Sequence, residues 1–429
     1  MIENDLALLQ PPQSSDAVTR LQWLLNQAES LEGEDYSQIL EFALTALSWG
    51  DFQQRWDIAK LFPKLGAGAI APLIALLEDE QTDWELRWFV SRILGDFHEP
   101  VVLEALVNLL KTSEGEDLIA TAAIALTNFG SAAIAALTDL LAEPRTRMVA
   151  ARSLCVIGGP ASVPPLLNVV GEFLQQDSYS SGDPALCAMA LEALSNSTDP
   201  AITPLLLQAL KHTAAPIRRA ATIGLGLRSD LLAQLDLVSL LQERLWDFNF
   251  EVCQAATIAL SRLGTPAAAI ALARLLQSPQ TPVPLQIEAV RALGWIGTPS
   301  ALEQLQSAIA MAPVPTLREI VWVLGRLSAL ETQIQATQIL LELLNSSLPN
   351  VQFPPIKQAI ALSLGQLGQP QAFDALVQLL ADSDKSVQLH AIAALRQLEA
   401  YPNLEQLSHS RLSPELAQGV ATALQELKV

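Results

Sequence analysis

The residues best suited to binding a partner are tryptophans and arginines that lie close together in segment 84–95, WELRWFVSRILG. On a helix, Trp84, Arg87, Trp88 and Arg92 fall near one face, because they are three, four and eight residues from the first. Trp and Arg are enriched at binding hot spots, where flat apolar area and charged hydrogen bonds act together. We predict that these four side chains contact a partner.

A second aromatic cluster lies in segment 246–250, WDFNF, which reads as a turn between two helices. We predict that Trp246, Phe248 and Phe250 contact a partner there. The alternative for both clusters is that the large side chains fill irregular spaces between packed helices. Two more tryptophans, Trp295 and Trp322, lie in later helices.

Residue types that carry out catalysis are sparse and scattered. No metalloprotease, phosphate-loop, serine-hydrolase or dinucleotide motif occurs, and no pair of histidines has metal-ligand spacing. The histidines are His98, His212, His390 and His409. We therefore predict no catalytic residue and no metal site.

The chain has three cysteines, which are tens of residues apart and lack any CxxC pairing. This usage fits a reducing compartment. Because each falls in a predicted helix, we expect Cys155, Cys187 and Cys253 to pack in the core as small apolar residues. The alternative is a thiol role, such as transient contact with a cofactor or an iron–sulfur cluster.

The elements that must position these residues repeat along the chain. In each copy, an apolar helix ends at a glycine, a small or proline-containing turn follows, and a Leu-rich helix ends in a polar turn. The markers are Gly66, Gly95, Gly130, Gly158, Gly226, Gly264, Gly297 and Gly368, with Asn196, Ser328 and Glu399 in the weaker copies. Their mean spacing is about 33 residues.

Each copy therefore encodes two helices. The first has apolar residues at helical spacing and a second stripe of alanines, as in segment 251–264. Its glycine is expected to end it in a left-handed conformation, and a following proline suits the start of the second helix. A single pair cannot bury its apolar face, so successive pairs must stack. We predict an all-α fold, a right-handed α-solenoid (α-α superhelix) of about eleven helical pairs.

Three regions are expected. Residues 1–62 form an N-terminal helical cap and a degenerate first repeat, residues 63–400 the solenoid, and residues 401–429 a C-terminal capping helix. We expect surface loops at 175–184 and 345–355. The uncharged run 118–138 is interpreted as two buried helices joined by a turn rather than a membrane span.

Charge narrows the choice of partner. The chain has 45 acidic and 25 basic residues, a net charge of −20, which disfavours nucleic acid and anionic membranes as ligands. Acids at the junctions between copies, Asp83 and Asp384 among them, are expected to cap helices; a functional acidic ridge is the alternative. The N-terminus has acids where a signal peptide has basic residues, so we expect a cytoplasmic protein with no membrane insertion.

The repeats resemble HEAT repeats over roughly residues 50–400. Segments 218–226 and 288–297 carry this likeness, each with Arg and Ala ahead of a Leu and a marker glycine. Segment 86–95 more particularly resembles the Arg-aromatic repeat of the cyanobacterial phycobilin lyase HEAT family. That resemblance implies a solenoid that handles a bilin or its phycobiliprotein acceptor, with Arg87, Trp88 and Arg92 contacting the acceptor or the tetrapyrrole propionates.

Lyases of that family often act as two shorter chains, whereas this is one long chain, and some relatives have no lyase activity. Our first hypothesis is a non-catalytic HEAT-repeat scaffold, an assembly factor or chaperone for a phycobilisome or photosystem. It would bind a phycobiliprotein or photosystem subunit along an extended inner surface, peripheral to thylakoid complexes, with no cofactor beyond a transient bilin. The alternatives are a bilin lyase that attaches a phycobilin to a phycobiliprotein cysteine, and an iron–sulfur cluster assembly helper.

Overall fold

The computed structural model describes residues 16–27, 34–175 and 183–428, and every regular element in these ranges is a helix. The contacts divide the chain into two compact units, residues 1–205 and 206–429. The boundary falls inside helix α13 (Ile202–Ala209). The prediction of an all-α fold is confirmed.

The first unit begins with two helices and continues as helix pairs. Its helices are α2 (Asp16–Gln27), α3 (Glu34–Trp49), α4 (Phe52–Ala59), α5 (Ile70–Glu78), α6 (Trp84–Leu94), α7 (Pro100–Thr112), α8 (Glu116–Asn128), α9 (Ile134–Leu140), α10 (Pro144–Ile157), α11 (Val163–Gln175) and α12 (Pro184–Leu194).

The second unit has the same plan and ends in a single helix. After α13 its helices are α14 (Ala215–Gly226), α15 (Leu237–Arg244), α16 (Phe250–Leu263), α17 (Pro266–Gln277), α18 (Val283–Ile296), α19 (Pro299–Ala308), α20 (Val314–Leu324), α21 (Leu330–Leu344), α22 (Pro354–Leu367), α23 (Phe373–Leu379), α24 (Lys385–Gln397), α25 (Tyr401–Ser408) and α26 (Pro414–Leu427).

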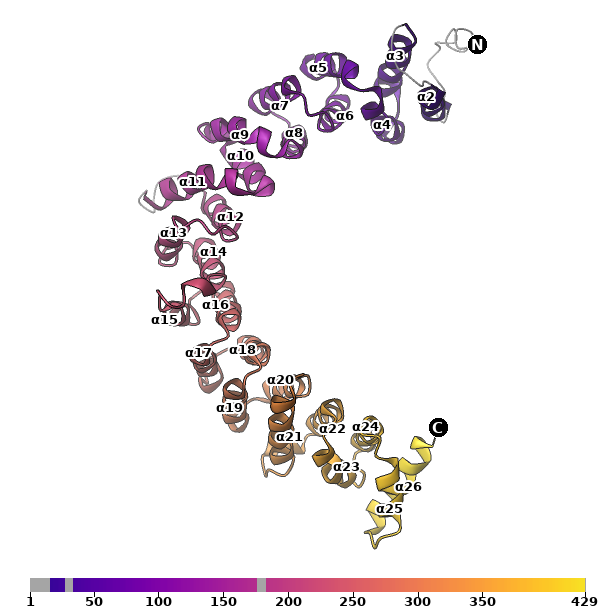
Figure 1. Cartoon of the computed structure of the whole chain (residues 1–429), viewed down its shortest axis with the longest axis vertical. Coiled ribbons are helices and arrows are strands. Elements are labelled where there is room, and N and C mark those ends of the chain that lie inside the picture. The colour runs from indigo at the N-terminus through magenta and orange to yellow at the C-terminus, as the bar shows by residue number, and fades with distance from the viewer. Residues whose placement is uncertain (1–15, 28–33, 176–182, 429) are drawn as a thin grey trace. The chain divides into compact units, whose positions relative to one another are not determined.

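Within each unit the even-numbered helices form one row and the odd-numbered helices another (Figure 1). Even helices pack on even neighbours, as α6 does on α8 and α18 on α20, while each also packs on an odd helix next to it in sequence. This two-row stacking is the α-solenoid arrangement that the repeats predict. From α4/α5 to α24/α25, the described residues contain eleven such pairs.

Alanine allows the even helices to approach one another closely. In α16, Ala255, Ala256 and Ala259 are buried together with Leu260. Gly226, at the end of α14, lies against Ala259, and a Cβ at Gly226 would come within 2.5 Å of the Ala259 Cβ. The even row is therefore held by close contact between helix backbones.

The marker glycines differ in conformation, and Gly66 and Gly158 have a positive φ with an extended ψ rather than the predicted left-handed helical conformation. Gly264 and Gly297 end their helices in the left-handed conformation, as predicted, and Glu399 adopts a φ of 52° at a marker position. The expectation is wrong for Gly95 and Gly226, which remain right-handed. There glycine is required by space, because a side chain would collide with the neighbouring even helix.

The predicted terminal helices are present: α2, α3 and α4 near the start, and α26, which Ser413 caps. Residues 118–138 form most of α8 and α9 with a turn between them, as predicted. No helix in the described ranges is both long and apolar enough to cross a bilayer. The predicted loop at 175–184 lies mostly outside the described residues, whereas 345–355 contains a short helical turn with Val351 buried, so it is not simply a surface loop.

Candidate partner-binding site

The site in the first unit begins with an ion-pair network between α4 and α6. Asp83 caps α6 by accepting a hydrogen bond from the backbone N–H of Leu86 at 2.9 Å. The buried Arg55 of α4 pairs with Asp83 at 3.4 Å and with Glu85 at 3.1 Å. Burial works against the Asp83 carboxylate, but the Leu86 N–H and Arg55 outweigh it and lower the pKa of Asp83. These contacts fix the register of α4 against α6.

Three aromatic rings from the same two helices, α4 and α6, lie close to one another, and we name Phe52, Trp56 and Trp88 the aromatic platform. Their centroids are 6.2 to 6.5 Å apart, and their planes lie within 30° of one another. The fully buried Phe89 meets each ring edge-on, at interplanar angles from 61° to 89°. Because the rings contact each other and a buried support, the platform is rigid.

Two cations border the platform. The Arg92 guanidinium carbon lies 4.3 Å from the centroid of the Trp56 ring, and the Lys60 ammonium lies 5.9 Å from it. Phe52 keeps 55% of its surface exposed, and Arg92 is exposed as well. Flat apolar area next to positive charge suits a planar ligand group that carries a carboxylate.

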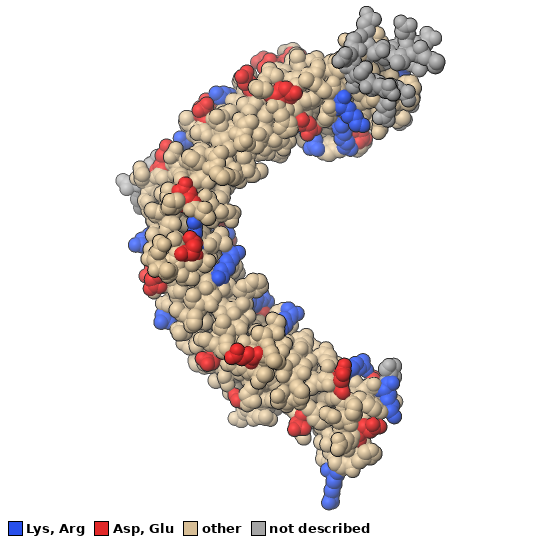
Figure 2. Space-filling view, in the orientation of Figure 1, with Lys and Arg blue, Asp and Glu red and all other residues tan. Residues whose placement is uncertain are grey.

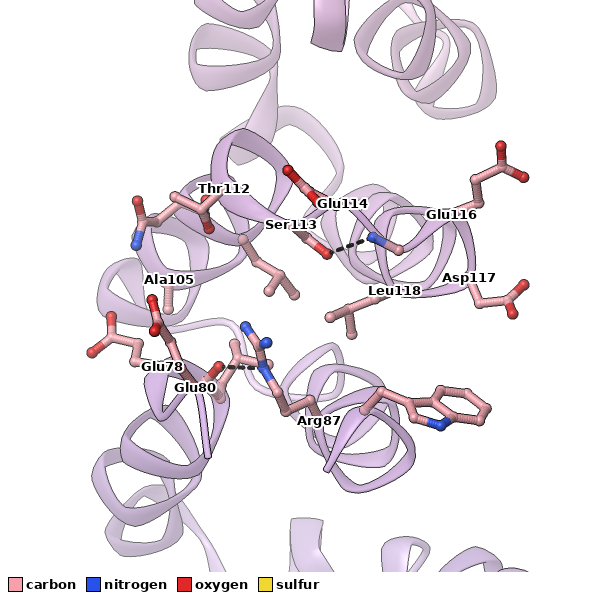
Figure 3. A pocket seen from close by; sticks show the side chains of 15 residues that line it. Glu78, Glu80, Arg87, Ala105, Thr112, Ser113, Glu114, Glu116, Asp117 and Leu118 are labelled. Carbon is pink, nitrogen blue, oxygen red and sulfur yellow. Dashed lines mark hydrogen bonds between the residues drawn. The ribbon is translucent and has the colours of Figure 1, made fainter. Parts of the chain in front are cut away.

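The structure does not bring the four predicted residues of segment 84–95 onto a single surface. Trp88 and Arg92 join the platform, whereas Trp84 and Arg87 line a hollow of about 900 Å³ beside the turns of the next helix pairs. Figure 3 shows the Arg87 guanidinium pointing into this hollow, with Glu80 on one side of it and Leu118 on the other. Trp84 is 67% exposed at its edge. The four residues diverge because an α-helix turns about 100° per residue, which places Arg87 and Arg92 about 140° apart around the helix axis.

Arg87 also has a role that repeats in other pairs. Its Nε donates to the carbonyl of Leu77, at the end of the preceding odd helix, at 2.9 Å. Arg147 donates in the same way to the carbonyl of Leu141 at the end of α9, and Gln286 donates to the carbonyl of Thr281 in the turn before α18. Each of these donors is the fourth residue after the N-cap position of its helix. Arg87 is thus a brace between successive helices, which the sequence interpretation missed although aligning the repeats on their caps would have shown it.

The second predicted cluster lies on a braced turn in the second unit, between α15 and α16. Phe248 is fully exposed at its tip, and Trp246 and Phe250 are 48% and 41% exposed. Beneath them the Asp247 carboxylate accepts hydrogen bonds from Arg218 Nε at 2.8 Å and Nη2 at 2.7 Å. All three aromatic side chains are therefore available to a partner, on a turn that is held in place from below.

The sequence analysis did not predict that Phe52, Trp56 and Lys60 belong to this site. The sequence interpretation assigned residues 1–62 to the N-terminal cap and degenerate first repeat. In the structure this region supplies Phe52 and Trp56 from α4 and Lys60 from the C-cap of α4, one turn apart, and they lie next to Trp88 and Arg92 of α6. The signal that could have found them is the four-residue interval between Phe52, Trp56 and Lys60.

The cysteines follow the packing prediction in part. Cys187 and Cys253 are buried, as predicted, whereas Cys155 is half-buried. Burial raises the pKa of the Cys155 thiol to about 11 and that of Cys187 to about 12. The described residues contain no group of three or more His, Cys, Asp or Glu side chains arranged to hold a metal ion. At neutral pH the side chains of Cys155 and Cys187 therefore remain protonated thiols, which are poor nucleophiles and poor metal ligands.

Comparison with known families gives one match. The family model of HEAT repeats matches residues 70–155, 203–286, 241–325, 316–396 and 348–428, which is more than half of the chain. No curated protein has a sequence that matches this chain.

Several solved structures are similar to the chain. A crystal structure of importin beta has a TM-score of 0.51 at 13% identity, over 96% of this chain and 63% of that one. Kap95p, from a structure with RanGDP, has a TM-score of 0.50 at 15% identity, over 99% of this chain and 60% of that one. CpcE and CpcF of phycocyanin lyase from Nostoc sp. PCC7120 have a TM-score of 0.31 at 22% identity, over 58% of this chain and 94% of that one. The chain spans less than two thirds of the importin beta and Kap95p chains, and at these identities the likeness shows the fold alone.

Proposed function

Because this chain belongs to the HEAT-repeat family, we propose that it is a non-catalytic scaffold that binds another protein along the exposed faces of its repeats. The observation that carries this proposal is the aromatic platform with Arg92 and Lys60 at its border. Aromatic and arginine side chains that are held in place before binding lose little conformational entropy when a partner arrives.

The nature of the partner comes from the resemblance of segment 86–95 to the phycobilin lyase HEAT family. On that basis we propose an assembly factor or chaperone for a photosynthetic pigment–protein complex, with a phycobiliprotein or photosystem subunit as its client. The protein would then act in the cytoplasm, and at thylakoid complexes only through that client. Trp88 and Arg92, which belong to both the resembling segment and the platform region, would contact the client directly.

Binding to a phycobiliprotein tests this proposal. The full chain is co-expressed with phycobiliprotein subunits, and the complex is measured by size-exclusion chromatography and calorimetry. The variant Phe52→Ala with Arg92→Gln alters two exposed residues of the site and should weaken the complex about tenfold or more. A matched variant, Ile124→Ala with Arg152→Gln, changes the same kinds of exposed residue on α8 and α10 and should bind normally. Equal binding by all three proteins would contradict the proposal.

A bilin lyase is the second candidate, and the same platform favours it. Nearly parallel rings with two cations offer a surface on which a flat tetrapyrrole with propionate groups could be held beside an acceptor thiol. Co-expression of the full chain with a phycobiliprotein and its bilin tests this function. Covalent attachment no greater than in a control without the chain would remove the lyase proposal and leave the scaffold proposal standing.

The third hypothesis, an iron–sulfur assembly helper, has no comparable observation in its favour. Two of the three thiols are buried, and burial raises the pKa of all three. Cluster ligands are thiolates, which this burial disfavours.

A further inference from the structure

The even-row helices of the second unit carry no unpaired negative charge between α16 and α22, although the chain as a whole has a net charge of −20. These four helices contain three acids. Glu251 pairs with Arg219 at 3.9 Å, and Glu288 and Glu319 pair with Arg291 at 3.2 and 2.7 Å. Each acid of this row therefore takes part in an ion pair within the fold, with Arg291 shared between Glu288 and Glu319.

Arginines remain on the same helices without acidic partners. Arg262 near the end of α16, Arg318 in α20 and Arg326 just after α20 are exposed, and none of them forms an ion pair within the described ranges. Figure 2 shows basic side chains along the even-row edge of the second unit in this region. This stretch of surface is locally positive on an acidic protein.

Large apolar side chains lie among these arginines. Trp295 of α18 is 81% exposed, and Ile258 of α16 is 48% exposed. Trp322 of α20 lies under Arg326, whose guanidinium carbon is 3.4 Å from the ring centroid.

The packing of α18 on α20 brings the two tryptophans to one area. A Cβ at Gly294 would overlap the Val323 side chain, so the two helices meet at these residues. Trp295 follows Gly294 and Trp322 precedes Val323 in sequence. On α20, Arg318 and Trp322 are one helical turn apart and share a face, and Arg326, just beyond the end of the helix, lies over the Trp322 ring.

We propose that these six residues form an Arg–Trp surface that binds an acidic segment of a partner protein with apolar or aromatic side chains between its carboxylates. The surface consists of Ile258, Arg262, Trp295, Arg318, Trp322 and Arg326. Arginine pairs with a carboxylate through two parallel hydrogen bonds, and an exposed indole binds flat apolar groups. This inference rests on the proposed scaffold function and assigns the class of partner for one face of the second unit.

We favour a protein partner over nucleic acid because this surface has few cations and the chain as a whole is acidic. A protein that binds duplex DNA strongly typically neutralises about 6 to 10 phosphates, and this surface has three unpaired arginines on a chain of net charge −20. A segment with a few carboxylates matches three arginines, and its apolar residues match the two tryptophans and Ile258.

The test uses two acidic polymers and the full chain. Fluorescently labelled poly-glutamate and a glutamate–tyrosine copolymer are titrated with the protein, and binding is measured by fluorescence anisotropy at low and at physiological salt. We expect the copolymer to bind more tightly than poly-glutamate. The triple variant Arg262→Gln, Arg318→Gln, Arg326→Gln should lose at least about tenfold in affinity for both.

A matched triple variant separates a local surface from overall charge. Lys211→Gln, Arg274→Gln, Arg411→Gln removes the same charge from other exposed positions of the second unit and should change the affinity less than about twofold. An equal loss in both triple variants would overturn the proposal, because the polymers would then respond only to net charge. Circular dichroism checks that each variant keeps its helices.

The aromatic part is tested by Trp295→Ala, a change at a largely exposed position. It should remove the preference for the copolymer and leave the affinity for poly-glutamate unchanged; a preserved preference would overturn the role of the tryptophan. Binding of a 20-nucleotide oligothymidylate as tight as that of the copolymer would overturn the assignment to protein. The triple arginine variant could still bind both polymers normally while Phe52→Ala with Arg92→Gln no longer binds a phycobiliprotein. In that case this inference fails and the proposed function stands.

Discussion

The aromatic platform of the first unit and the Arg–Trp surface of the second are built from the same residue types and packed in opposite ways. In the platform, three rings contact one another, and Phe89 supports them from below. In the Arg–Trp surface, the Trp322 ring lies against the Arg326 guanidinium, and neither Trp322 nor Trp295 has an aromatic ring as a partner within the described ranges. The comparison teaches that composition predicts a binding surface only together with the packing beneath it.

The charges around the two regions differ as well. Acids border the platform: Asp57 pairs with Lys60, and Asp83 and Glu85 pair with Arg55. On the Arg–Trp surface the acids pair with Arg291, and three arginines are left over. We therefore expect the platform to bind mainly through shape and apolar area, and the Arg–Trp surface to bind in a salt-dependent way.

The largest predicted effect concerns the support of the platform. Phe89→Ala removes a fully buried ring and should lower the free energy of unfolding by about 3 to 5 kcal/mol, because a cavity opens under three rings. Urea unfolding monitored by tryptophan fluorescence measures the loss. Leu260→Ala, which removes a fully buried side chain from the second unit, should cost about 2 to 5 kcal/mol and leave the platform intact. A cost below about 0.5 kcal/mol for Phe89→Ala would mean that the platform does not rest on that ring.

The next effect concerns the ion pairs between α4 and α6. Arg55→Met removes the bonds of a buried guanidinium to Asp83, Glu85 and the carbonyl of Ser48, and should cost about 2 kcal/mol. Differential scanning calorimetry of the variant and the wild type measures this cost. Arg291→Met on the second unit breaks exposed pairs and should cost about 1 kcal/mol or less. Equal costs for the two variants would contradict the distinction between the two regions.

Local sequence signals explain how much of the fold could be predicted. Helix ends are encoded by residues that are near in sequence. Gly297 ends α18 and Pro299 begins α19, and Ser413 caps α26. The repeat, the helix ends and the all-α class follow from these signals. At Gly95 and Gly226 the conformation was mispredicted, because the reason for glycine there is a contact with another helix rather than a turn.

The site could be predicted less well, because it depends on pairs of residues that are far apart in sequence. Trp88 and Arg92 were identified from their types, but their partner Trp56 lies on another helix. Arg87 was expected to contact a partner, and the structure shows that it also bonds to the carbonyl of Leu77. Within segment 84–95 alone nothing distinguishes Arg87 from Arg92; the distinguishing signal is the position of Arg87 four residues after the N-cap Asp83, which becomes visible only when the repeats are aligned on their caps.

A smaller effect is the pH dependence of the ion pairs between Arg55 and the acids at the start of α6. The pKa of Asp83 is lowered because the Leu86 N–H and Arg55 outweigh the effect of burial. A carboxyl with a lowered folded pKa contributes stability that is present above its unfolded pKa and is lost as pH falls through the folded value. The difference in unfolding free energy between the wild type and Arg55→Met should therefore be constant near neutral pH and shrink once pH falls below the ordinary aspartate range. A difference that stays constant into strong acid would show that Asp83 does not take part.

The smallest effect on stability is expected at Trp295, where the two regions differ most. Because its side chain is 81% exposed and contacts no other ring in the described part of the chain, Trp295→Ala should change the free energy of unfolding by less than about 0.5 kcal/mol. Trp88→Ala on the platform should cost several times more, because Trp88 packs against Phe52, Trp56 and Phe89. Thermal melts of the two variants measure this contrast. If Trp295→Ala destabilises the protein as much as Trp88→Ala, then Trp295 supports the fold, and its exposure no longer argues for a partner.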